Sequence, residues 1–117
     1  MKRMKSVDIL KGALKKFGRN GRNWIQGSYA RQRKNGDGVG VHEASARCFC
    51  AVGAMQSVIG PLPAVGLKKA RWALAKAIGG QLNDSEGSVL RFNDRTTTTF
   101  KDVRRAFRKA IRILEAA

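Results

Sequence analysis

The stretch from residue 44 to residue 59 reads Ala-Ser-Ala-Arg-Cys-Phe-Cys-Ala-Val-Gly-Ala-Met-Gln-Ser-Val-Ile. It is small or apolar on nearly every side, which predicts a buried central helix from about Glu43 to Ile59. Gly53 inside this helix costs about 1 kcal/mol relative to alanine, so we expect another backbone to pack closely against it. Gly60 and Pro61 end the helix.

Three further segments show the apolar spacing of amphipathic helices. They run from about Val7 to Phe17, from about Val65 to Ile78, and from Thr99 to about Leu114. The last is the clearest, because six apolar residues form one stripe: Phe100, Val103, Phe107, Ala110, Ile111 and Leu114. Thr99 through Asp102 reads as a capping box in which Asp replaces Glu.

The segments between these helices are rich in glycine and polar residues. Residues 19–41 are predicted as a loop whose part 28–41 is flexible and basic, and residues 23–30 as a short strand or an extended arm anchored by Trp24. Residues 81–88 are expected to form a polar loop, and residues 89–93 a short strand. The predicted fold is therefore mostly α, a compact four-helix domain with a possible short two-stranded β element (α+β).

The 117 residues amount to one domain, 1–117. The charged start lacks the apolar run of a signal peptide, and no stretch is long and apolar enough for a membrane span. We therefore expect a protein of the bacterial cytoplasm with no membrane partner, in which Cys48 and Cys50 stay reduced. With one histidine and two cysteines that point apart on a helix, we expect no metal and no cofactor.

The formal net charge is +16, from 24 Lys and Arg against 8 Asp and Glu. An excess of this size repels itself, and its usual partners are the phosphates of nucleic acids. The charge gathers before residue 35 and along the predicted last helix, where arginines recur every fourth residue. The candidate polyanion-binding residues are Lys11, Lys15, Lys16, Arg19, Arg22, Arg31, Arg33, Lys34, Arg104, Arg105, Arg108, Lys109 and Arg112.

Three short motifs follow one another along the chain: Trp-Ile-Gln-Gly at 24–27, Cys-Ala-Val-Gly-Ala at 50–54 and Asn-Asp at 93–94. In order and spacing they resemble a small uncharacterised family of bacteria and their phages, over roughly residues 9–114. Phe92 departs from that pattern, which tends to have Trp, and so does the high basic charge. The resemblance implies a compact, mostly helical scaffold and a possible phage origin, without an activity. Its core residues are Trp24, Gln26, Gly27, Cys50, Gly53, Ala54, Asn93 and Asp94.

From these observations we expect a non-enzymatic protein that binds the phosphate backbone of nucleic acid or a nucleoprotein complex. One alternative is a phage-type inhibitor or adaptor, for example an anti-defence or anti-CRISPR protein, that docks on an acidic host protein or a nucleic-acid groove. A second is a small hydrolase with Cys48 or Cys50 as nucleophile, His42 as base and Asn93 or Asp94 as orienting residue. The predicted helix argues against it, because it places Cys50 about two turns from the helix start.

Overall fold

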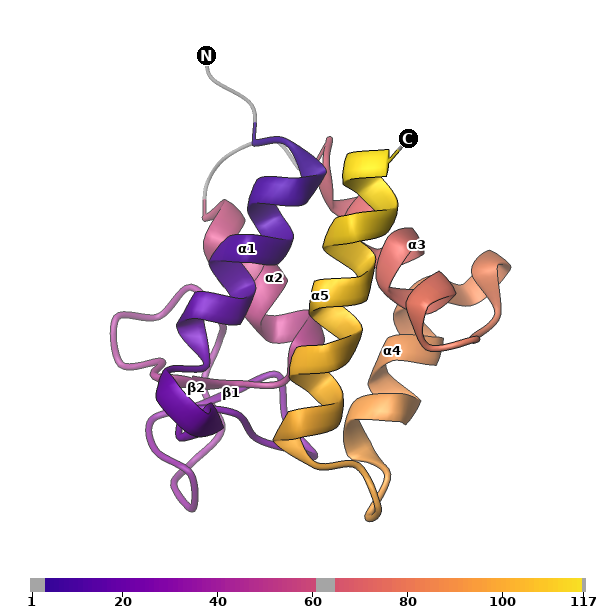
Figure 1. Cartoon of the computed structure of the whole chain (residues 1–117). Helices are drawn as coiled ribbons and strands as arrows, with labels where there is room; N and C mark the ends of the chain where they lie inside the picture. The colour runs from indigo at the N-terminus through magenta and orange to yellow at the C-terminus, as the bar shows by residue number, and fades with distance from the viewer. Residues whose placement is uncertain (1–3, 61–64, 117) are drawn as a thin grey trace.

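The computed structural model describes residues 4–60 and 65–116. Within these residues, five α-helices and two short 3-10 turns surround a small antiparallel sheet (Figure 1). The elements in chain order are α1 (Ser6–Lys16), η1 (Arg19–Gly21), β1 (Ala30–Arg31), β2 (Cys48–Phe49), α2 (Ala51–Ile59), α3 (Leu67–Ala77), η2 (Leu82–Asp84), α4 (Ser85–Asp94) and α5 (Phe100–Ala116). The prediction of a mostly α domain with a small β element is confirmed.

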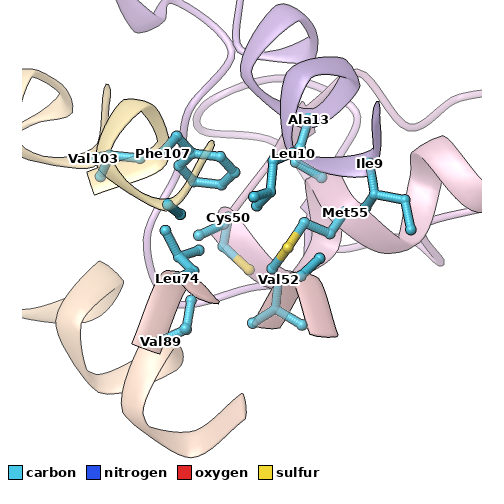
Figure 2. Packing of buried hydrophobic residues seen from close by; sticks show 14 of the residues in the cluster. Ile9, Leu10, Ala13, Cys50, Val52, Met55, Leu74, Val89, Val103 and Phe107 are labelled. Atoms are coloured by element: carbon cyan, nitrogen blue, oxygen red, sulfur yellow. The ribbon is translucent and has the colours of Figure 1, made fainter. Parts of the chain in front are cut away.

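The helix α2 lies at the centre of the core, as its composition predicts. Its residues Val52, Ala54 and Met55 are completely buried, and Figure 2 shows side chains from all five helices meeting in one cluster around it. The close approach predicted at Gly53 is also confirmed, because a Cβ there would overlap the carbonyl oxygen of Tyr29. Residues 61–64, which include the predicted helix stop at Pro61, lie outside the described residues.

The prediction that this helix begins at Glu43 is wrong, because α2 begins at Ala51. The residues before it are drawn into the sheet, where Cys48 pairs with Arg31 and Phe49 with Ala30. Residues 23–25 run along the other side of β2, since the Ile25 amide donates to the Phe49 carbonyl at 3.1 Å and the Phe49 amide to the Asn23 carbonyl at 2.8 Å. This pairing holds β2 extended, so the helix cannot start earlier.

The strand predicted at residues 89–93 is also wrong, because these residues belong to α4. Asp84 caps this helix by accepting a hydrogen bond from the Gly87 amide at 3.2 Å. Val89 and Asn93, four residues apart and fully buried, form its inner face. The predicted polar loop 81–88 is accordingly replaced by η2 and the first turn of α4, and the described residues hold five helices rather than four.

The helices α1 and α5 pack side by side in opposite directions (Figure 1). The Phe17 ring at the end of α1 makes edge-on contacts with Phe100 and Phe107, with centroids 5.6 Å apart in both pairs. At the other end, Lys11 Nζ lies 3.3 Å from a carboxylate oxygen of Glu115. The two helices therefore form one continuous side of the molecule.

The predicted capping box opens α5 and is confirmed. The Thr99 amide donates to Asp102 Oδ2 at 2.9 Å, and the Asp102 amide donates to Thr99 Oγ1 at 3.4 Å. The hydrogen bond from the Thr99 amide is the main reason that the pKa of the Asp102 carboxyl lies below its usual value. A fixed start sets the angular position of every later side chain on α5.

No helix within residues 4–60 and 65–116 has the length and apolar character needed to cross a membrane.

The segment predicted as a flexible basic loop contains β1 and a turn closed by hydrogen bonds, including one from the Gln32 amide to the Asp37 carbonyl at 3.3 Å. Its flexibility stays a prediction.

Candidate functional site

The motif residues of the sequence converge on the buried side chain of Asn93, at the inner side of α4. Its Oδ1 accepts hydrogen bonds from the Trp24 indole at 2.7 Å and the Ala51 amide at 3.0 Å. Its Nδ2 donates to the Ile25 carbonyl at 3.0 Å and to Asp94 Oδ1 at 2.9 Å. All four positions of the amide are therefore used, and one side chain joins α4, the start of α2 and the 23–27 segment.

Two neighbours of Asn93 extend this network to the surface. Gln26 donates from Nε2 to the carbonyls of Asn93, at 2.8 Å, and of Arg95, at 2.7 Å. Asp94 Oδ1 also accepts from the Gly27 amide at 3.0 Å. Asp94 is the last residue of α4, so this bond ties the end of that helix to the 23–27 segment. These polar side chains satisfy backbone groups of the loops that they join, which is a structural role.

Cys50 lies at the N-cap of α2, where its sulfur accepts a hydrogen bond from the Gly53 amide at 3.3 Å. The prediction that it sits two turns inside a helix is therefore wrong. Burial nevertheless raises the pKa of its thiol above the ordinary value of 9.0, opposite to the shift that activates a cysteine nucleophile. Cys50 lines a small pocket with Asp94, whereas His42 lines a different pocket with Lys16 and Glu43.

The predicted cations of α5 project from its outer surface. Val103, Ala106, Phe107 and Ala110 face the core, and four of the predicted cations are exposed: Arg105, Arg108, Lys109 and Arg112. Arg104 is half-buried, with its guanidinium 5.7 Å from the centre of the Phe100 ring. This cation–π contact holds Arg104 in place at the start of the row.

Part of the exposed surface of α5 borders α1. Arg104, Arg108 and Arg112 stand four residues apart, and Glu115, two turns beyond Arg108, reaches Lys11 of α1. On α1, Lys11 and Lys15 are both exposed. We call the surface formed by these five cations the α1–α5 basic face: Lys11, Lys15, Arg104, Arg108 and Arg112.

The turn η1 adds Arg19 and Arg22 at one end of this face. Gly21 has a φ of 73°, and a Cβ there would overlap the Phe100 ring, so η1 lies directly against the start of α5. The side chain of Arg22 runs over Gly18, at the end of α1. Both arginines are exposed and lie at the same end of the face as Arg104.

Six of the predicted binding residues lie off this face. Two of them, Arg105 and Lys109, are on α5 but line a small pocket with Phe92 of α4, and the other four are on other elements or on the other side of α1. Lys16 turns to the other side of α1, with its ammonium 5.7 Å from the centre of the Phe49 ring. Arg31 of β1 is held locally, donating to Ser28 Oγ at 3.2 Å and to the Lys34 carbonyl at 3.0 Å. Arg33 and Lys34 are exposed in the turn after β1 and belong to neither α1 nor α5.

Few carboxylates balance the α1–α5 basic face. Within residues 4–60 and 65–116 there are three ion pairs: Lys11–Glu115, Arg71–Glu86 and Arg91–Asp84. One of them lies on the face, and the other carboxylates of these two helices in the described residues are Asp8 and Asp102, each in a first turn. In this part of the chain, Lys15, Arg104, Arg108 and Arg112 have no carboxylate partner, so the face is a concentrated positive patch.

One family model matches residues 1–113, and its description is a family of unknown function, DUF6197. The chain belongs to the DUF6197 family. This confirms the expected membership of an uncharacterised family. No curated protein matches this DUF6197 chain. No solved structure matches it either.

The sequence did not reveal two contacts of this DUF6197 protein. The first is the bond between the Ala51 amide and Asn93, which fixes where α2 begins. The second is the aromatic group of Phe100 and Phe17 beneath Arg104, which joins the two halves of the face. The four-residue spacing of Phe100 and Arg104 was a signal for the cation–π contact, but the meeting of distant segments has no local signal.

Among the described residues, no three His, Cys, Asp or Glu side chains gather as metal ligands would.

Proposed function

We propose that this chain is a non-enzymatic nucleic-acid-binding module that contacts the phosphate backbone through the α1–α5 basic face. The observation that supports this most is the arginine row on α5, a helix fixed at its start by a capping box and along its side by α1. Arginine forks suit bidentate contact with phosphate. We place the module in the bacterial cytoplasm, where nucleic acid is present and its free thiols stay reduced.

Docking of the same face on an acidic host protein is the alternative, as in a phage-type inhibitor. Two results together would favour that alternative. The chain would show no affinity for nucleic acid, and a pull-down from nuclease-treated lysate would recover one stoichiometric acidic protein. A cysteine hydrolase has no such support, since the Cys50 thiol is buried and its pKa is raised.

The salt dependence of binding tests the proposal. Fluorescence anisotropy with a labelled oligonucleotide should show affinity falling steeply as salt rises, because each neutralised phosphate releases condensed counterions. The triple variant Arg104/Arg108/Arg112→Ala should reduce the slope of log affinity against log salt by about 0.9 for each phosphate that it no longer neutralises. Equal affinity at low and high salt would overturn the proposal.

A matched control removes the same charge from another part of the surface. Arg33, Arg47 and Arg95 are exposed arginines outside the face. The variant Arg33/Arg47/Arg95→Ala has the same net charge as the α5 triple variant and should keep most of the wild-type slope. An equal reduction in the two variants would show that total charge, and not the face, determines binding.

A further inference from the structure

We infer that the α1–α5 basic face takes double-stranded rather than single-stranded nucleic acid, and that it contacts the backbone without reading sequence. This inference rests on the proposed function and specifies its ligand. Three observations carry it: the aromatic side chains available near the face, the fixed spacing of its cations, and the seating of α5 among its neighbours.

Proteins that bind single strands stack the bases on exposed aromatic rings. Near the face the aromatic rings are already engaged: Phe100 lies beneath Arg104 and against Phe17, and Trp24 is tilted against Phe100 with centroids 6.3 Å apart. Within residues 4–60 and 65–116, the aromatic residue among the exposed large side chains is Tyr29, 43% exposed and next to β1. The described part of the face therefore offers cations but no stacking platform.

The cations stand on rigid elements at regular intervals. Arg104, Arg108 and Arg112 follow one another at about 6 Å along the helix axis and span about 12 Å. Each strand of a duplex carries one phosphate per ~3.4 Å of its axis, so a row of this length covers the axial rise of three or four phosphates. A duplex holds those phosphates in fixed positions, whereas a single strand must be ordered on binding at an entropic cost.

Lys11 and Lys15 form a second row on α1. Packed helices have axes about 8–10 Å apart, a separation between the ~6 Å width of the minor groove and the ~12 Å width of the major groove. Both groove edges are lined by phosphates, within reach of long lysine and arginine side chains. Two rows of cations therefore suit the two strands of a double helix.

The position of α5 disfavours reading of base edges. A recognition helix enters the major groove because it protrudes from its domain, but α5 packs against α1 on one side and α3 on the other (Figure 1). A broad surface of this kind rests on the backbone. Contacts to phosphates position a protein on nucleic acid but carry no sequence information.

The test compares short labelled duplexes of DNA and of RNA with their own single strands, by anisotropy in one buffer. We expect at least one duplex to bind about tenfold more tightly than its strands, with little change when its sequence is shuffled. The α5 triple variant Arg104/Arg108/Arg112→Ala should lose this preference, and the equally charged Arg33/Arg47/Arg95→Ala variant should retain it. Circular dichroism checks that both variants are folded.

Single strands that bind as tightly as both duplexes, or more tightly, would overturn the inference and leave the proposed function standing. A strong preference for one shuffled sequence would also overturn it. If no probe binds, the proposed function itself fails, so the two failures are distinguishable.

Discussion

Asn93 shows how much of this fold depends on one side chain. It is completely buried, and a buried amide is tolerated only when its donors and acceptors are paired. Here each of its four bonds goes to a different partner, from Trp24 in the early part of the chain to Asp94 beside it. The aromatic ring that it fixes, Trp24, contacts Phe100 at the start of α5. The buried network thus supports the surface that carries the arginines.

Replacing Asn93 by Ala should lower the free energy of unfolding by about 3 kcal/mol, because several buried groups would lose their partners. Urea denaturation followed by circular dichroism measures this change. The same substitution at Asn83, which is exposed in η2, is the control and should change stability by less than about 0.5 kcal/mol. Similar losses in the two variants would contradict the role assigned to Asn93.

Cys50 predicts a dependence of stability on alkaline pH. Its thiol has a pKa above 9.0 in the folded protein, whereas the unfolded thiol titrates near its ordinary value, so the folded state keeps its proton longer. The resulting stabilisation is complete below the unfolded pKa and is lost as pH rises through the folded pKa. Cys50→Ser keeps an N-cap acceptor but has no thiolate to form. Denaturation curves from neutral pH to pH above 9.0 should show a smaller alkaline loss in Cys50→Ser than in the wild type, and equal losses would contradict the burial argument.

At the scale of elements, the contact between α2 and the 23–31 segment determines the local architecture. The Cys50 amide donates to the Tyr29 carbonyl at 3.2 Å, and the same carbonyl oxygen lies against Gly53 in the first turn of α2. Only a residue without a side chain leaves room for this approach. The segment before β1 and the start of α2 are therefore held together through backbone atoms.

Gly53→Ala should reverse the usual effect of alanine in a helix. Alanine normally stabilises a helix by about 1 kcal/mol relative to glycine, but here the new methyl group would overlap the Tyr29 carbonyl, and we expect a loss of about 1–3 kcal/mol. Thermal and urea unfolding measure the sign directly. Gln56→Ala, at a half-buried position of the same helix, serves as a control for helix propensity. A stabilised Gly53→Ala variant would show that the contact relaxes without cost.

The elements that the sequence predicts well are those whose signals are local. The helix α5 combines a long apolar stripe with a capping box whose two residues, Thr99 and Asp102, are three positions apart. Both signals lie within or directly before its own segment. The start of α2 is not predicted, because Cys48 and Phe49 are extended by partners far away in sequence. The helix α4 is not predicted either, because the five residues of 89–93 are too few to separate helical from strand periodicity, and its cap at Asp84 lies in a polar stretch typical of loops.

For the molecule as a whole, the sequence locates the charge but not its arrangement. It identifies the arginine row of α5 and the lysines of α1 as separate clusters. Packing of the first helix on the last joins Lys11 and Lys15 to that row, and it leaves Arg31, Arg33 and Lys34 on other elements. This arrangement depends on contacts across nearly the whole chain, such as Lys11 with Glu115, which periodicity within a segment cannot predict.

The packing of α1 on α5 also bears on how the chain folds as it is made. Phe17 is completely buried, and its ring contacts include Phe107, a residue near the other end of the described chain. During synthesis α1 emerges long before this partner exists, so the part of its apolar face that α5 covers stays open to solvent or to chaperones. Contacts between residues so far apart in sequence slow folding relative to bundles built from neighbouring helices. The packing of α1 on α5, which brings the cations of the basic face together, therefore also leaves the newly made chain vulnerable to aggregation until α5 is complete.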